Sequence, residues 1–110
     1  MLLLLLVLLD NDDDENGFTD DVRGWDFYSS DNDPLHDGNK YHGSHTSGIA
    51  ASVGNNEIGV AGVCWKCKIM PVKIFGEAGG SIGASEGIVY AAENGADVIS
   101  NSWGGGPHSK

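Results

Sequence analysis

The stretch KIMPVKIFGEAGGSIGASEGIVYAAENGADVISN, residues 68–101, decides the fold class. Residues 68–75 and 96–101 are short apolar runs of the kind that form buried strands. Between them, Ser81 is placed to cap a helix, and Asn94-Gly95 is placed to end it because both residues tolerate the left-handed conformation. Strand, helix and strand in this order predict a crossover unit of α/β architecture.

The segment HGSHTSG, residues 42–48, predicts a histidine held at the start of a helix. Small side chains follow His42, and they let a helix lie close to neighbouring backbone even though several are poor helix formers. A histidine that acts as a general base needs such a rigid support and an open face toward substrate. Two ordinary histidines in a polar loop are the alternative interpretation.

Composition and charge limit the classes of partner. The chain has 110 residues and a formal net charge of −10, and 11 of its 16 acidic residues lie between Asp10 and Asp37. Such a field repels phosphate backbones, so we expect no nucleic-acid partner. The apolar run 1–9 lacks a basic leader and is far shorter than the ~20 residues that cross a bilayer, so we expect no membrane anchor. Two interpretations of this run remain, a buried strand and a truncated or wrongly chosen start of the sequence.

The acidic segment contains a candidate calcium loop. Asp12, Asp14 and Asn16 place oxygen ligands on alternate residues, and Gly17 follows them. This is the opening pattern of a calcium loop, but the twelfth position falls on Arg23, which excludes an EF-hand. A solvated acidic loop without a metal is the alternative.

The pair Cys64 and Cys67 forms a C-x-x-C motif. A dithiol oxidoreductase would place this motif at the start of a helix, whereas an apolar strand follows it here. Zinc would need further ligands, and no second cysteine pair exists. A short-range disulfide or two reduced thiols are the remaining interpretations.

Several segments recur in an order typical of one enzyme family. HGSHTSGIAA, residues 42–51, is similar to the pattern H-G-T-H-V-A-G-x-x-A. The others are DDVRGWDF, DNDP, NNEIGVAGV, KIMPVKIF, GIVYAAENGADVI and NSWGG. In this order they resemble the subtilisin-like serine endopeptidases, the subtilases. The resemblance implies a three-layer α/β sandwich around a parallel sheet, of which this chain is an incomplete part. In that division residues 1–9 are an apolar strand, residues 10–40 an acidic loop region and residues 41–110 the α/β portion.

The resemblance also assigns roles to single residues. His42 matches the general base of a Ser-His-Asp triad. His45 matches a structural histidine, and we expect it to pack more deeply than His42. Ser102 is not in the family's serine motif, and no D-T-G or D-S-G supplies the aspartate. Asp10 follows the run 1–9, which can be interpreted as a parallel strand that delivers a carboxylate at its carboxyl end, but Asn11 and Asp12 stand where the family has a small residue and glycine. We therefore expect a fragment that is inactive by itself, with a non-catalytic, calcium-stabilised α/β module as the rival hypothesis.

The resemblance further implies a cleft for a polypeptide substrate and a second calcium loop. Asn56 matches a calcium ligand that backbone carbonyls of its loop would complete, with a metal-free turn as the alternative. Family habit implies secretion, and nothing in the sequence fixes the oligomeric state. We expect Trp103 itself to be a buried sheet residue. The residues that match the walls of the cleft are Gly79, Gly80, Ser102, Trp103 and Gly104.

Overall fold

The computed structural model describes residues 2–7 as backbone, and residues 18, 21–36, 38, 41–76 and 80–104. Neither helix among these residues is long and apolar enough to cross a membrane. The elements in chain order are β1 (Leu2–Val7), β2 (Trp25–Asp26), α1 (His42–Ala51), β3 (Ile69–Lys73), α2 (Ala84–Glu93) and β4 (Ala96–Ser100).

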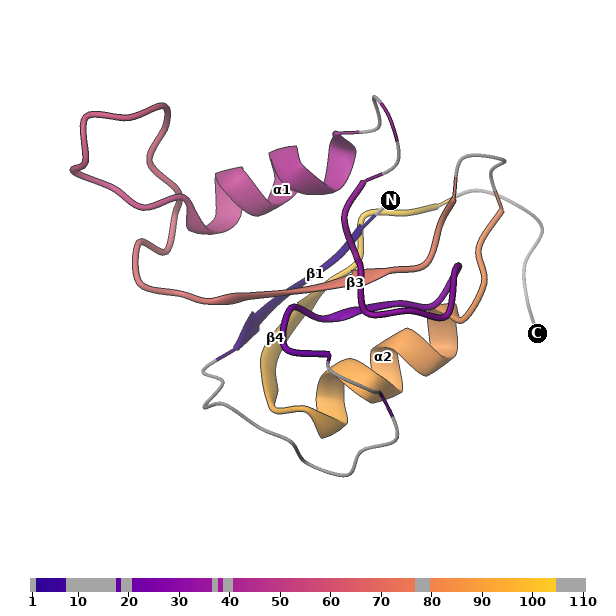
Figure 1. Ribbon diagram of the computed structural model, residues 1–110. Coiled ribbons are helices and arrows are strands. Elements are labelled where there is room, and N and C mark those ends of the chain that lie inside the picture. The colour runs from indigo at the N-terminus through magenta and orange to yellow at the C-terminus, as the bar shows by residue number, and fades with distance from the viewer. Residues whose placement is uncertain are drawn as a thin grey trace.

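The strands form one sheet in the order β2-β3-β1-β4. Figure 1 shows α1 on one side of this sheet and α2 on the other, so the described chain has three layers. β2 is parallel to β3, and β3 and β4 share a direction because each is antiparallel to β1. The expected α/β class, with strand, helix and strand across residues 68–101, is confirmed.

The direction of β1 differs from expectation. A parallel strand would deliver its carboxyl end beside the carboxyl ends of β3 and β4. Instead Leu2 pairs with Lys73, and Val7 pairs with Ala96, so β1 ends where β3 and β4 begin. The hypothesis of a parallel first strand is therefore wrong, and the sheet is mixed. A run of identical leucines suits a central strand, but it carries no alternation that would fix direction or register.

The core lies between β3 and α2. Its fully buried apolar side chains come from alternate positions of the strand and its continuation, and from one face of the helix. Gly87 lets the helix approach closely, because a Cβ atom there would lie 3.1 Å from Val72 Cγ1. The buried apolar residues are Met70, Val72, Ile74, Tyr90 and Ala91.

An aromatic cluster fastens α2 to the segment around β2. Phe18 makes edge contacts with Trp25 and Phe27, and its ring centroid lies 4.8 Å from that of Tyr90. The Tyr90 hydroxyl donates a 2.5 Å hydrogen bond to Asp21 Oδ2. A buried tyrosine normally needs such a partner for its hydroxyl, so one end of this side chain packs while the other is hydrogen-bonded.

The helix ends test the predicted capping residues. Ser81 is not the cap: α2 begins after Gly83, whose φ of 71° is left-handed, and no side chain caps the helix. Gly83 is required sterically as well, because a Cβ atom there would lie 2.7 Å from Phe27 Cβ. The end of the helix is as predicted, with Asn94 as C-cap and Gly95 at a φ of 84°.

Pro71 sits inside β3, where a proline removes a ladder hydrogen bond. β2 pairs only with Val72 and Lys73, so at Pro71 the strand has β1 alone as a neighbour. Gly24, which precedes β2 with a φ of 99°, packs on the Pro71 carbonyl, and a Cβ atom there would lie 1.9 Å from that oxygen. Glycine is therefore required where the chain crosses the proline.

Candidate active site

His42 is the first residue of α1, and its side chain is exposed. No side chain caps the helix at Tyr41. Hydroxyl groups instead bond back to the carbonyls of the first turn: Thr46 Oγ1 to His42 at 3.2 Å, and Ser47 Oγ to Gly43 at 2.7 Å. These bonds and the buried Gly43 fix the first turn, so the imidazole projects from a rigid support.

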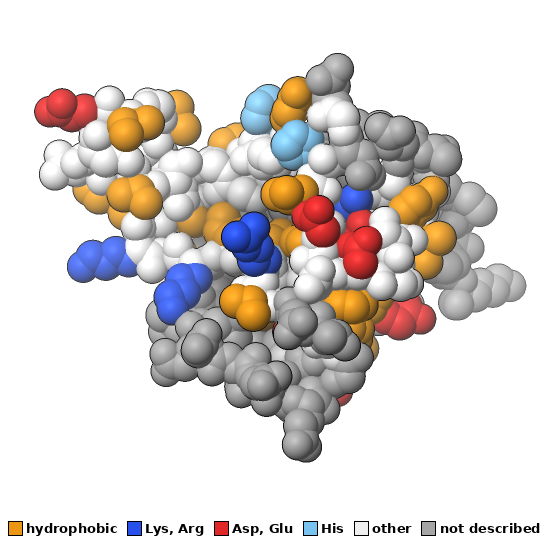
Figure 2. All heavy atoms as spheres, in the orientation of Figure 1, with side chains coloured by type: hydrophobic (Ala, Val, Ile, Leu, Met, Phe, Trp, Pro, Cys, Tyr) orange, Lys and Arg blue, Asp and Glu red, His pale blue; other side chains and the backbone are white. Residues whose placement is uncertain are grey.

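The first turn of α1 lies at the end of the sheet where β3 and β4 finish (Figure 1). Figure 2 shows histidine side chains on the surface in this region, next to hydrophobic side chains. The expectation that His45 packs more deeply is wrong, because His45 is exposed like His42. His36 contributes a ring contact with Tyr41, with centroids 4.7 Å apart, and so ties the preceding segment to the helix start.

The residues expected to form the cleft walls lie in the segments that follow β3 and β4. Gly80 has a φ of 79°, and neither Gly80 nor Gly104 has an atom within 4 Å of the place a Cβ would occupy. Ser102 and Trp103 are half-buried, and the Trp103 ring lies 6.5 Å from that of Phe75. This aromatic contact joins the two segments. The expectation that Trp103 is a buried sheet residue is wrong, because Trp103 lies after the end of β4 at Ser100 and is half-buried, although its ring packs against the core.

Several predicted site residues lie outside the described residues. They are Asp10, Asp12, Asp14, Asn16 and Gly79. The parallel strand on which the candidacy of Asp10 depends is absent, since β1 runs antiparallel to both neighbours. Within the described ranges, no three His, Cys, Asp or Glu side chains are grouped so that they could hold a metal ion.

The loop around Asn56 has an unusual backbone. Asn55, Glu57 and Gly59 all adopt left-handed φ values, of 57°, 60° and 62°. The Asn56 amide oxygen accepts a 3.1 Å hydrogen bond from the Ile58 amide. Figure 1 shows this loop projecting from the end of α1. Its donor chemistry, the Asn56 amide oxygen and the backbone carbonyls of exposed residues, fits Ca²⁺, which takes oxygen ligands of this kind.

Cys64 and Cys67 are joined by a disulfide, with Cα atoms 5.5 Å apart. The short-range disulfide is thus the correct interpretation among those left open. Neither cysteine starts a helix: Trp65 and Lys66 form a turn, and β3 follows. The placement that a dithiol oxidoreductase would require is absent.

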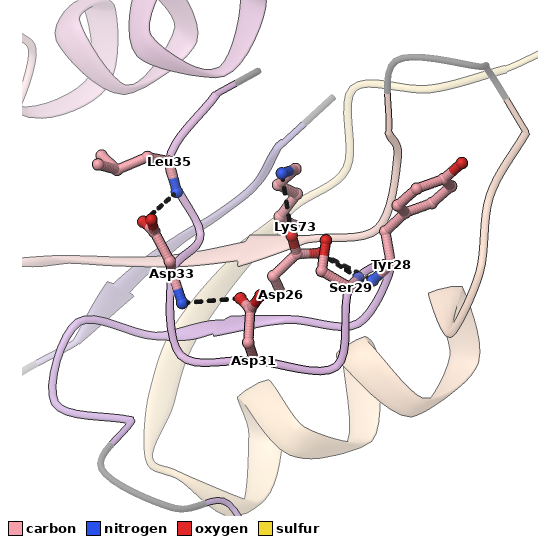
Figure 3. Close-up of polar contacts among 7 residues, drawn as sticks. All are labelled: Asp26, Tyr28, Ser29, Asp31, Asp33, Leu35 and Lys73. Atoms are coloured by element: carbon pink, nitrogen blue, oxygen red, sulfur yellow. Dashed lines mark hydrogen bonds and ion pairs between the residues drawn. The ribbon is translucent and has the colours of Figure 1, made fainter.

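A buried ion pair supports the segment that continues from β3, which is expected to form one wall of the cleft, and the sequence patterns did not predict it. Lys73 Nζ lies 2.9 Å from Asp26 Oδ2, and the two side chains are 7% and 1% exposed. Figure 3 shows Asp26 Oδ1 also accepting the amide hydrogens of Tyr28 and Ser29, at 2.8 and 3.1 Å. A lysine inside an otherwise apolar strand was the available signal, since a buried charge requires a partner.

The turn that follows Asp26 packs against the same wall. A Cβ atom on Gly76 would lie 2.1 Å from Tyr28 Cε1, so the tyrosine ring rests directly on that backbone. Asp31 closes the turn through backbone bonds to Asp26 in both directions, at 2.8 and 3.1 Å. In Figure 3 the Asp31 carboxylate accepts the Asp33 amide. The ion pair and turn therefore hold the chain where it leaves β3.

Comparisons with known proteins agree with this architecture. Residues 6–110 match the subtilase family. The chain is 45% identical over 86 residues to thermitase of Thermoactinomyces vulgaris, which covers 76% of this chain and 30% of thermitase. It is 39% identical over 85 residues to a thermophilic serine proteinase of Bacillus sp. strain AK1, covering 76% of this chain and 21% of that protein. An extracellular protease of Xanthomonas campestris is 39% identical over 77 residues, which is 60% of this chain and 13% of that protease. No solved structure matches the chain significantly.

Proposed function

The chain belongs to the subtilase family, and from that premise we propose that it forms part of a serine endopeptidase in which His42 is the general base. It spans less than a third of the length of thermitase. The observation that carries the proposal is the exposed imidazole on the first residue of α1, at the end of the sheet where β3 and β4 finish.

In this mechanism one ring nitrogen of His42 takes the proton of a serine hydroxyl as the oxygen attacks a peptide carbonyl. The imidazolium then gives the proton to the leaving amine, and an acyl-enzyme forms. We assign the nucleophile to no serine of this chain, because Ser102 is half-buried at the end of β4 and lies in no serine motif. The serine and the oxyanion donor belong to the part of the family's domain that this chain does not span.

The substrate is a polypeptide in extended conformation. Gly80 on one side and Ser102 to Gly104 on the other offer main-chain groups to it, and the open space at both glycines lets a peptide backbone approach. Hydrogen bonds of this kind add the substrate as an extra strand. Gly79 would extend the first wall, and Trp103 would support the second through Phe75.

The loop that holds Asn56 would bind a structural calcium ion, through the amide oxygen and backbone carbonyls. We expect millimolar calcium to raise the melting temperature relative to excess chelator, because an ion that binds only the folded chain stabilises it by mass action. Asn56→Ala should remove most of the shift. Asn101→Ala, which removes an exposed amide side chain outside this loop, is the matched control and should leave the shift unchanged. An unchanged melting temperature in calcium would refute this site.

The proposed activity can be tested in a protein that extends this reading frame to include a serine motif. We expect His42→Ala to lower kcat/KM by about 10⁴-fold or more, as loss of a triad member does. His45→Ala is the matched control, because it removes an exposed imidazole from the same helix, and kcat/KM should then stay within about tenfold. The present chain alone should give no turnover, since oxyanion stabilisation and nucleophile are both required. Equal activity in the two variants would refute the role of His42.

Two relatives are named as extracellular proteases, from Xanthomonas campestris and Dichelobacter nodosus. We propose the same location for this protein. The disulfide between Cys64 and Cys67 supports that location, because such bonds persist in oxidising compartments.

A further inference from the structure

The segment directly before the disulfide closes the end of α1. The amides of Gly62, Val63 and Cys64 donate to the carbonyls of Ser52, Ile49 and Ala50, at 2.9, 3.0 and 2.8 Å. The last carbonyls of a helix have no partner within it, so these three bonds satisfy groups that would otherwise need water. Residues 53–61 consequently form a loop whose two ends are joined at this neck.

Close backbone contacts hold the same neck. A Cβ atom on Gly62 would lie 2.3 Å from the Ser52 nitrogen, so only glycine fits there. A Cβ atom on Gly54 would lie 2.2 Å from Trp65 Cε2, so the indole ring rests on the Gly54 backbone. Trp65 lies between the two cysteines, and the disulfide fixes the turn that directs its ring onto the loop.

The disulfide is accessible from solvent on the side of this turn. Trp65 is 54% exposed, Lys66 is exposed, and each cysteine is half-buried. Lys66 and Lys68, both exposed, flank Cys67 in the chain. Attack of a thiolate on one sulfur of such a disulfide displaces the other sulfur as a thiolate.

We propose that Cys64 and Cys67 form a site of reversible thiol–disulfide exchange with a dithiol, and that their reduction opens the neck of the 53–61 loop. A thiolate of the dithiol attacks Cys64 Sγ, the bond between Cys64 and Cys67 breaks, and Cys67 leaves as a thiolate that takes a proton. The second thiol of the dithiol then attacks the dithiol's first sulfur, which is bonded to Cys64 in the mixed disulfide, and Cys64 is released. Two electrons and two protons pass to the chain, and the dithiol becomes a disulfide.

Reduction removes the constraint that turns Trp65 toward Gly54. The three amide bonds at the neck then border a loop whose residues 55–61 are all exposed. Exposed hydrogen bonds with little apolar cover open readily. This inference concerns the end of α1 opposite His42, and it does not depend on peptide hydrolysis.

Hydrogen exchange on the wild-type chain tests the proposal, with excess dithiothreitol as the probe and chelator present throughout. Mass analysis after alkylation should show two free thiols formed without denaturant. Exchange at the amides of residues 62–64 should accelerate about tenfold or more on reduction. The Ile82 amide, which donates to Ile74 at 3.0 Å in another part of the fold, is the internal reference and should not change. Oxidised dithiothreitol should restore slow exchange.

The variant Cys64→Ser with Cys67→Ser should show the fast exchange of the reduced chain and no response to the dithiol. Tryptophan fluorescence of the chain should also change on reduction. The variant Trp65→Phe should abolish this change if it comes from the Trp65 indole. A disulfide that resists the dithiol until denaturant is added would overturn the proposal. Reduction that leaves exchange at residues 62–64 unchanged would overturn it as well, and both results come from the wild-type chain without any substitution.

Discussion

Replacing Lys73 with methionine isolates the contribution of the buried ion pair. Methionine keeps an unbranched apolar side chain that can pack along β3, but it removes the ammonium that lies 2.9 Å from Asp26. The Asp26 carboxylate, 1% exposed, then remains in the interior without a counter-charge. The two amide hydrogen bonds from Tyr28 and Ser29 persist and stabilise part of that charge.

Breaking a buried pair from one side costs about 3–5 kcal/mol, and the two remaining amide bonds place this case near 3 kcal/mol. A domain of this size has a free energy of unfolding of roughly 5–15 kcal/mol, so the loss is a large share of the total. The double variant, Asp26→Asn with Lys73→Met, removes both charges. It should recover part of the loss, because no unpaired charge is then buried.

Urea unfolding followed by circular dichroism measures these differences. The wild type, Lys73→Met, Asp26→Asn and the double variant form a double-mutant cycle. Lys66→Met is the matched control, since Lys66 is exposed and its loss should change the free energy of unfolding by no more than about 0.5 kcal/mol. If Lys73→Met and Lys66→Met destabilise the chain equally, the ion pair does not hold the end of β3.

Two further substitutions test the packing. Gly24→Ala should lower the free energy of unfolding by about 3 kcal/mol or more, because the new Cβ meets the Pro71 carbonyl and the residue has a φ of 99°. Gly59→Ala is the control and should cost only about 1 kcal/mol, because Gly59 has a φ of 62° but nothing within 4 Å of the new Cβ. Equal midpoints of urea unfolding for the two variants would contradict the steric argument. Tyr90→Phe keeps the aromatic contacts and removes the hydrogen bond to Asp21, so we expect a loss of about 1.5–3 kcal/mol by thermal unfolding, and an unchanged melting temperature would show that the bond contributes nothing.

Local patterns predicted the parts of the fold that local chemistry determines. The apolar run 68–75 contains β3, and Asn94 with Gly95 ends α2 as expected. The start of α2 was not predictable from Ser81, because contact with Phe27 requires glycine at residue 83, and glycine supplies the left-handed turn. The direction of β1 was not predictable either, since a leucine run reads almost alike in both directions.

The candidate site divides in the same way. His42 was placed correctly at the start of a helix by the small residues that follow it. The packing of His45 was inferred from the family alone, and the described chain provides no cover for that residue, which is exposed. The partnership of Asp26 with Lys73 joins residues 47 positions apart (73 − 26) through the pairing of β2 with β3. Such contacts depend on how the strands are arranged. A single sequence shows the two residues but not that they are partners.

Separate sets of interactions hold the parts of the candidate site that lie in this chain. Bonds from Thr46 and Ser47 fix the first turn of α1, while the neck at residues 62–64 fixes its far end. The wall beyond β3 depends instead on the ion pair between Asp26 and Lys73. These sets share no residue, and energetic effects at sites without shared partners usually add. The proposed base and the proposed substrate wall should therefore be perturbed independently, so a change in substrate binding after Lys73→Met need not alter the exchange measured at the neck.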